Sequence, residues 1–141
     1  MTVEFCDTNV LVYAHDMSAG DKRETAVELL SRLWQARAGA ISVQVLQELF
    51  VTLTRRVLPP IPHGDARAII VQLSAWLVVA PVASDVLDAI DAVARWQISL
   101  WDAMVLTSAR KAGAEVLWSE DLSDGQDYDG VVVRNPFAAA Q

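Results

Sequence analysis

The sequence has little cysteine, little histidine and no long apolar run, and each of these scarcities excludes a class of protein. Cys6 is the only cysteine, so no disulfide can form within the chain, and its apolar neighbours favour a small buried side chain. The two histidines, His15 and His63, lack the spacing of zinc ligands. The most apolar stretch, residues 68–83, is interrupted by polar residues and a proline, whereas a membrane-spanning helix needs roughly 18 consecutive apolar residues. We therefore expect neither a disulfide-stabilised protein nor a membrane-spanning one.

Basic residues are also scarce. The chain has 11 Lys and Arg residues against 18 Asp and Glu residues, a net charge of −7, which argues against binding of nucleic acid through a broad basic face. The start of the chain lacks the basic residues and long apolar core of a secretory signal, so we expect a cytoplasmic location. At 141 residues the chain has the commonest size of one domain. We expect that domain over residues 1–137, with a flexible tail at residues 138–141.

Hydrophobic residues make up 53% of the chain, and they alternate between short β-branched runs and longer stretches of helical period. This alternation is typical of repeated β-α units. The predicted fold class is therefore α/β, with a short, mostly parallel sheet of about five strands. The expected strands are residues 3–6, 40–42, 76–79, 115–118 and 131–134.

Helices are expected between these strands. Asp21 can cap the first of them, which Gly39 would end. The second runs over residues 43–57 and stops before a proline cluster, and a shorter one fills residues 65–75. Another starts at residue 84 or 85, and a last one runs from residue 99 to residue 113. The apolar residues expected to face inward on the helix from residue 84 or 85 are Val86, Leu87, Ile90, Val93 and Ala94.

Four acidic residues map to one edge of this predicted sheet. Asp7 ends the first strand and Asp121 follows the fourth, while Glu48 lies in the helix after the second strand and Asp102 opens the helix that leads to the fourth. Ligands of open parallel sheets bind outside the carboxyl ends of the strands, where loops and helix starts converge. We therefore expect these four carboxylates to lie near one another.

Carboxylates brought together repel one another, so such a group normally persists because a cation neutralises it. Oxygen ligands select Mg²⁺ or Mn²⁺ over zinc, and the sequence offers no His or Cys cluster as an alternative. Ions held in this way can activate water and stabilise the leaving oxygen of a phosphodiester. The pattern favours metal-dependent phosphodiester hydrolysis.

Each acid also has a purely structural interpretation. Asp7 can cap the helix that follows it, and Ser99 with Asp102 fits a capping box. Glu48 can be a solvated residue at the margin of its helix stripe. Residues 121–129 form a polar turn whose acids, at least the last two, can be solvated; the ligand spacing of a calcium-binding loop is absent there. Position alone leaves the structural and catalytic interpretations open.

Four short motifs give the chain a resemblance to a known family. They are Asp7-Thr8-Asn9, Gln47-Glu48, Trp101-Asp102-Ala103 and Ser119-Glu120-Asp121-Leu122. In this order they resemble the motifs of PIN domains, and most closely those of VapC-type toxins from bacterial toxin–antitoxin pairs. The likeness continues through Gly125-Gln126, Asp129-Gly130-Val131 and Asn135-Pro136-Phe137, so it covers nearly the whole chain.

The resemblance implies a three-layer α/β/α sandwich and an endoribonuclease that uses Mg²⁺, with Mn²⁺ able to substitute. It implies that Asp7, Glu48, Asp102 and Asp121 form the catalytic metal site. Asn9 and Ser119 would be polar neighbours of that site and Asp124 an outer acid; Glu120 receives no role. Ser119 stands where the family often has threonine, which keeps the hydroxyl. Family members also form homodimers and are silenced by a small antitoxin, so the expected partners are RNA, an antitoxin and a second copy.

Two other functions remain as alternatives. One is a PIN domain that binds partners without catalysis. The other is a phosphoacceptor signalling domain, against which the sequence speaks because no acidic pair follows the first strand and no suitable lysine ends the fifth. The metal would answer the objection raised by the acidic charge, because it supplies positive charge to phosphate.

Contacts to the RNA backbone and aromatic stacking can also be predicted from residue types. The basic candidates for backbone contact are Arg55, Arg56, Arg67, Arg110 and Lys111. Trp34, Trp76, Trp96 and Trp118 are predicted to be core residues, whereas Trp101, next to Asp102, could line the cleft.

Overall fold

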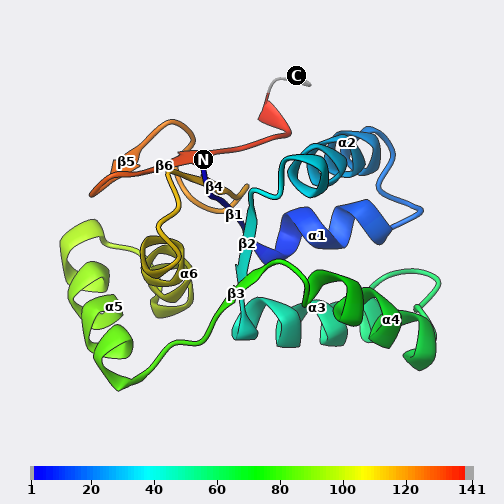
Figure 1. Ribbon diagram of the computed structural model, residues 1–141, viewed down its shortest axis with the longest axis horizontal. Coiled ribbons are helices and arrows are strands. Elements are labelled where there is room, and N and C mark those ends of the chain that lie inside the picture. The colour runs from blue at the N-terminus through cyan, green and yellow to red at the C-terminus, as the bar shows by residue number, and fades with distance from the viewer. Residues whose placement is uncertain (1, 139–141) are drawn as a thin grey trace.

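A computed structural model describes residues 2–138 and gives a mixed α/β fold on a single sheet (Figure 1). Of the expected tail, residues 139–141 lie outside the described residues, and the Ala138 N–H donates to the carbonyl of Asn135 at 3.3 Å. Within the described part of the chain the sheet has six strands, in the order β3-β2-β1-β4-β6-β5. They are β1 (Glu4–Cys6), β2 (Gly39–Ser42), β3 (Leu77–Val79), β4 (Val116–Trp118), β5 (Asp127–Tyr128) and β6 (Val131–Arg134).

The five predicted strands are all present and all pair in parallel, as expected for β-α units. The sixth strand, β5, was not predicted, and it pairs antiparallel with β6. It forms a hairpin whose two loop residues, Asp129 and Gly130, have φ values of 55° and 98°. Positive φ at both loop residues is the requirement of the tight turns that join two-residue hairpins, and Asp-Gly meets it well.

Over residues 2–138, six helices cover the two faces of the sheet (Figure 1). Helices α1 to α4 lie on one side and α5 and α6 on the other, so the expected three-layer α/β/α arrangement is confirmed. The helices are α1 (Thr8–His15), α2 (Asp21–Ala36), α3 (Val43–Arg55), α4 (His63–Leu73), α5 (Ala83–Trp96) and α6 (Leu100–Lys111). None of those within residues 2–138 combines the length and apolar character needed to cross a membrane.

The ends of α2 differ from the prediction. Asp21 is the first residue of this helix and its N-cap is Gly20, so Asp21 is not the cap. The helix ends at Ala36, where Arg37 takes a left-handed conformation, and Gly39 instead begins β2. A Cβ at position 39 would lie 2.5 Å from the ring of Trp76, so this glycine is required for the close approach of that ring to the strand.

The tryptophans predicted to be core residues differ in their burial. Trp76 is buried, and Trp96 and Trp118 are half-buried against the core. Trp34 packs edge-on against Trp76 with ring centroids 5.6 Å apart, yet it is 41% exposed. Trp101 is 69% exposed. Of these five tryptophans, Trp76 alone is therefore a full member of the core.

The buried face of α5 also differs from the prediction. Ala89 and its neighbours Ala92 and Val93 pack against Ala103 and Met104 of α6. Small side chains allow the two helices to approach closely, because alanine leaves room for the partner's side chains. Of the five residues expected to face inward, Val93 does so, while the other four are exposed: Val86, Leu87, Ile90 and Ala94. The helix therefore keeps an apolar ridge on its outer side.

Candidate metal and active site

The pairing of β1 with β4 brings the first and last predicted acids to the same edge of the sheet. Cys6 is in register with Trp118, and the N–H of Asp7 donates to the carbonyl of Trp118 at 2.9 Å. Asp7 and Ser119 are therefore the next residues beyond two paired strand ends. This register fixes the distance between the Asp7 carboxylate and the segment that carries Asp121.

Asp7 is a buried carboxylate whose two oxygens both accept hydrogen bonds. Its Oδ1 accepts from the N–H of Thr8 and its Oδ2 from the hydroxyl of Ser119, both at 2.8 Å. Burial is the main cause that raises the pKa of Asp7 to about 6; the bonds from Ser119 and Thr8 oppose this rise, while Asp121 and Asp102 add to it. The structure thus confirms that Asp7 caps α1 and shows that it also faces two other acids.

Asp121 is exposed and is held by two polar neighbours. The side-chain amide of Asn9 donates to its Oδ2 at 2.9 Å, and its own N–H donates to the Ser119 hydroxyl oxygen at 3.1 Å. Ser119 is fully buried. Its one hydroxyl group donates to Asp7 and accepts from the N–H of Asp121. The contacts place Asn9 and Ser119 beside Asp7 and Asp121, as the resemblance implied.

Glu48 reaches the same region through a residue that the sequence analysis did not single out. The Thr8 hydroxyl donates to Oε2 of Glu48 at 3.0 Å, and Thr8 directly follows Asp7. Glu48 itself is exposed and lines a hollow that also contains Arg56. The signal that could have indicated Thr8 is its place in the Asp-Thr-Asn motif, where a hydroxyl follows the buried acid.

Asp102 stands in the first turn of α6 and is half-buried. Its N–H donates to the hydroxyl oxygen of the N-cap residue Ser99 at 3.1 Å, which confirms Ser99 as the cap. The reciprocal bond of the predicted capping box, from the Ser99 N–H to the Asp102 carboxylate, is not among the hydrogen bonds of residues 2–138. Burial raises the pKa of Asp102 above its usual range, opposed by Ser99 and increased by Asp121. The capping contact and the proximity to Asp121 therefore coexist.

Asp124 makes its described contact elsewhere. Its Oδ1 accepts from the N–H of Asn135 at 2.9 Å, which fastens the loop after β4 to the segment after β6. Glu120, which received no role from the sequence, accepts from the Tyr13 hydroxyl at 2.5 Å and from Lys22 at 3.0 Å.

The four acids lack cationic partners in the described part of the chain. Across residues 2–138, no ion pair includes Asp7, Glu48, Asp102 or Asp121. Thr8 contacts both Asp7 and Glu48, and Ser119 contacts both Asp7 and the N–H of Asp121. Nowhere in the same residues do three His, Cys, Asp or Glu side chains stand close enough to hold one ion. One further oxygen, Oδ1 of Asn9, is buried without a hydrogen-bond partner. Oxygen donors and uncompensated negative charge fit a hard divalent cation, although the donors do not form a closed cage.

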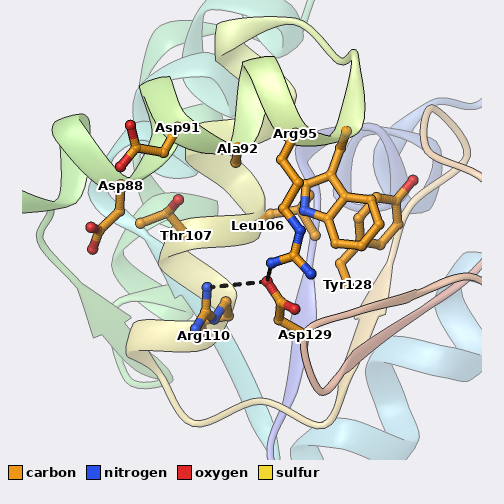
Figure 2. A pocket seen from close by; sticks show the side chains of 10 residues that line it. Asp88, Asp91, Ala92, Arg95, Leu106, Thr107, Arg110, Tyr128 and Asp129 are labelled. Atoms are coloured by element: carbon orange, nitrogen blue, oxygen red, sulfur yellow. Dashed lines mark hydrogen bonds and ion pairs between the residues drawn. The ribbon is translucent and has the colours of Figure 1, made fainter.

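A second group of acids lies toward the other end of α6, and in this group Asp129 pairs with arginine (Figure 2). Asp129 pairs with Arg95 at 2.6 Å and lies 3.9 Å from Arg110, at a hollow of about 260 Å³ between α5, α6 and the β5–β6 turn. Asp129 is exposed, as predicted for a solvated loop acid, and it also forms an ion pair that was not predicted. Arg110 is eight residues beyond Asp102, about 12 Å along the helix. Lys111 pairs with Asp85 at 2.7 Å, so two of the five basic candidates for RNA contact are engaged away from the acidic edge.

Comparison with solved structures supports the fold described above. Among solved structures the chain is similar to VapC20 of Mycobacterium tuberculosis, described as a sarcin-ricin loop cleaving toxin, at 24% identity and a TM-score of 0.64, covering 84% of this chain and 89% of that one. It is also similar to a chain of a toxin–antitoxin complex from Klebsiella pneumoniae, at 22% identity and a TM-score of 0.68, with coverage of 96% and 98%. A third similar structure is VapBC2 of Rickettsia felis bound to a promoter DNA fragment, at 16% identity and a TM-score of 0.67, with coverage of 95% and 98%.

These structural likenesses agree on the fold, and sequence comparison adds the family. No curated protein matches the chain by sequence. The sequence model of the PIN domain, however, matches residues 5–123, which include all four acids and the segments that hold them. The chain therefore belongs to the PIN-domain family.

Proposed function

We propose that this chain is a metal-dependent endoribonuclease and the toxin of a toxin–antitoxin pair. The observation that carries the proposal is that Asp102 and Asp121 lie near enough to Asp7, at one sheet edge, to raise its pKa. None of these three acids has an ion-pair partner among residues 2–138. The description of the Mycobacterium tuberculosis relative as a toxin that cleaves the sarcin-ricin loop supports RNA as the substrate class.

In this proposal Asp7, Glu48, Asp102 and Asp121 hold Mg²⁺, for which Mn²⁺ can substitute. The bound ion supplies activation of a water molecule and stabilisation of the leaving oxygen of the phosphodiester. Thr8 and Ser119 orient the Asp7 carboxylate, because each donates to one of its oxygens. Asn9 orients Asp121 through its amide and offers its buried Oδ1 to the same region. Glu48 is exposed, so its carboxylate can be reached from bulk solvent.

Two partner proteins belong to the same proposal. An antitoxin is supported by the toxin–antitoxin complexes among the similar structures. A homodimer is the family's usual state, and the exposed apolar ridge of α5, with Val86, Leu87 and Ile90, is the kind of surface that protein interfaces use.

The alternative is a PIN domain that binds partners without catalysis, and one observation favours it. Within residues 2–138 the carboxylates are not assembled into a group of three that could hold an ion as they stand. A phosphoacceptor role suits the structure less well, since Asp7 is 6% exposed and both of its oxygens are engaged.

The test is RNA cleavage by purified protein during titration with Mn²⁺ and Mg²⁺. A sarcin-ricin loop oligonucleotide is the first substrate, followed by transfer RNA and messenger RNA. Asp7→Asn and Asp102→Asn should each lower metal-dependent cleavage by about 100-fold or more, since each removes a charged ligand of the ion. The matched control is Asp129→Asn, which removes an equivalent acid at the Arg95 end and should leave cleavage nearly unchanged.

Circular dichroism must show that each variant keeps its fold. Undiminished cleavage by Asp7→Asn and Asp102→Asn would contradict the site, and a wild-type protein that binds Mn²⁺ but cleaves none of these RNAs would favour the binding-module alternative.

A further inference from the structure

The segment that carries Asp121 is held by a neighbouring acid that the proposed chemistry does not use. Glu120 accepts from the hydroxyl of Tyr13 through Oε1 at 2.5 Å and from the ammonium of Lys22 through Oε2 at 3.0 Å. Tyr13 belongs to α1 and Lys22 to the first turn of α2, so two helices fix both oxygens of this one carboxylate. We call Tyr13, Lys22 and Glu120 the Glu120 clamp.

Helix α1 contacts Glu120 and Asp121 along one face. Asn9 donates to Asp121 and Tyr13 to Glu120, and these two donors are four residues apart, which places them on the same side of a helix. Ser119 is fixed in the same segment by its bond to Asp7. Three consecutive side chains, at positions 119, 120 and 121, are therefore each held by a different partner.

The clamp is itself held by aromatic packing. The ammonium of Lys22 lies 4.8 Å from the centroid of the Tyr13 ring and 5.5 Å from that of Phe137. The two rings meet edge-on with centroids 5.0 Å apart, and Phe137 is buried. Aromatic faces attract a cation, so these rings keep Lys22 directed at Glu120.

Asp121 needs such support because it faces like charges. It is exposed, and it raises the pKa of both Asp7 and Asp102, which shows that the three carboxylates repel one another. An exposed loop aspartate can relieve this repulsion by turning into solvent. From these observations we propose that the Glu120 clamp is a positioning device, which keeps Asp121 directed toward Asp7 before any cation binds.

This inference rests on the proposed function, and its size follows from the contacts. Each clamp contact is a partly exposed polar interaction, with Lys22 side-chain exposure of 45% and Glu120 exposure of 21%. Loss of one such contact should weaken cation binding by roughly two- to five-fold. At saturating metal the maximal cleavage rate should return to nearly the wild-type value, while the metal concentration for half-maximal cleavage rises by the same factor.

A simple effect of charge predicts the opposite sign for one variant. Removing the positive charge of Lys22 from the neighbourhood of the acids would strengthen Mn²⁺ binding if only long-range attraction mattered. The clamp predicts weaker Mn²⁺ binding by Lys22→Met, because Glu120 and the segment that carries Asp121 lose the contact with Lys22. Tyr13→Phe removes a hydroxyl without changing the charge, and it too should weaken binding.

The experiment measures Mn²⁺ binding to the full chain without RNA, by electron paramagnetic resonance of the free ion, for Lys22→Met, Tyr13→Phe and Lys22→Arg. The matched control is Lys111→Met, which breaks a lysine–carboxylate pair of 2.7 Å at the far end of α6. Lys22→Met should bind two- to five-fold more weakly than Lys111→Met, and Tyr13→Phe more weakly than wild type. Lys22→Arg, which keeps the charge and can donate to Glu120, should restore most of the affinity.

Thermal melting shows that a variant is folded at the temperature of the binding measurement. Binding by Lys22→Met that equals or exceeds that of Lys111→Met, or binding by Tyr13→Phe that equals wild type, overturns the clamp while leaving the metal site intact. A wild-type protein that binds no Mn²⁺ refutes the metal-dependent function itself, and the clamp with it.

Discussion

The two ends of α6 carry acidic residues in opposite electrostatic settings. At the first end Asp102 joins Asp7 and Asp121, and these acids are held by hydroxyl, amide and backbone groups. At the other end Asp129 and Asp85 are held by arginine and lysine. Aspartates thus have cationic side chains as partners at one end of α6, and among residues 2–138 they have none at the other end.

The difference shows which acids serve the fold and which are available for a ligand. An aspartate paired with arginine fastens one element to another, as Asp129 fastens the β5–β6 turn to α5. An aspartate oriented only by neutral donors keeps its charge and its remaining lone pairs for another partner. The arrangement at the first end therefore costs stability in the absence of a cation, and that cost can be measured.

The largest expected effect is a pH dependence that differs in sign between the two ends. Folding raises the pKa of Asp7 from 3.8 to about 6, so its contribution to stability is fully present below pH 3.8 and is lost as the pH rises through 6. With metal chelated, the stability of Asp7→Asn relative to wild type should increase by about 3 kcal/mol as the pH rises from 3.5 to 7.5. Urea unfolding at several pH values measures this difference.

Asp85 provides the comparison at the other end. Lys111, and then the N–H of Val82, lowers the pKa of Asp85, so its contribution is present above its unfolded pKa and is lost as the pH falls through the folded value. The advantage of wild type over Asp85→Asn should therefore grow with rising pH. Parallel curves for the two variants would break the comparison.

The next effect is stabilisation by a divalent cation. At a free Mn²⁺ concentration about 30 times the dissociation constant, wild type should gain about 2 kcal/mol, because the ion binds the folded state alone. Asp129→Asn should gain as much, whereas Asp7→Asn and Asp121→Asn should gain little. The melting temperature with and without chelator gives the answer, and equal gains in all four proteins would place the cation elsewhere.

The smallest effect concerns RNA contact. Arg56 lines the same hollow as Glu48, whereas Arg110 lies at the other end of α6 beside Asp129. Arg56→Gln should reduce the slope of log affinity against log salt by about 0.7 for single-stranded RNA, and Arg110→Gln should leave it unchanged. Filter binding at several salt concentrations, with both substitutions made in a variant that does not cleave RNA, measures the two slopes. An equal change in slope for Arg56→Gln and Arg110→Gln would contradict the prediction that Arg56 alone contacts RNA.

Much of the fold could be predicted from the sequence because the buried elements carry strong local signals. The run at β1 is fully buried and β-branched runs mark β6, so both strands were predicted to within a residue. The hairpin strand β5 was missed because two residues in a polar segment give no periodic signal. Its Asp-Gly turn was nevertheless present in the sequence.

The outward-facing side of α5 could not be predicted for a different reason. An apolar stripe indicates which side of a helix avoids water, but it does not show that a partner surface exists within the chain. Here α6 meets the alanine side of α5 through Ala89 and Ala92, and Ile90 remains 51% exposed. Shape at the helix contact outweighed the hydrophobic stripe.

Strand order and the resemblance predicted where the acids lie and that Asn9 and Ser119 are their neighbours, but two further contacts near the acids were not predicted. Asp7, Asp102 and Asp121 could be placed at one edge from strand order, and the structure shows their mutual influence. Thr8 and Glu120 acquire their contacts only through pairing between elements that are distant in the sequence, such as Thr8 with Glu48 and Glu120 with Tyr13. No local pattern records such pairs.

The position of β4 in the sheet has a consequence for the stage of synthesis at which the acidic site can form. Strand β1 is made first, yet its neighbour β4 begins at Val116, and Asp121 follows β4. A growing chain that ends before this point holds Asp7, Glu48 and Asp102 but lacks Ser119, the residue that orients Asp7 toward Asp121. Synthesis must therefore pass beyond residue 121 before Asp7, Asp102 and Asp121 can be brought together, so a shorter nascent chain cannot assemble the acidic site.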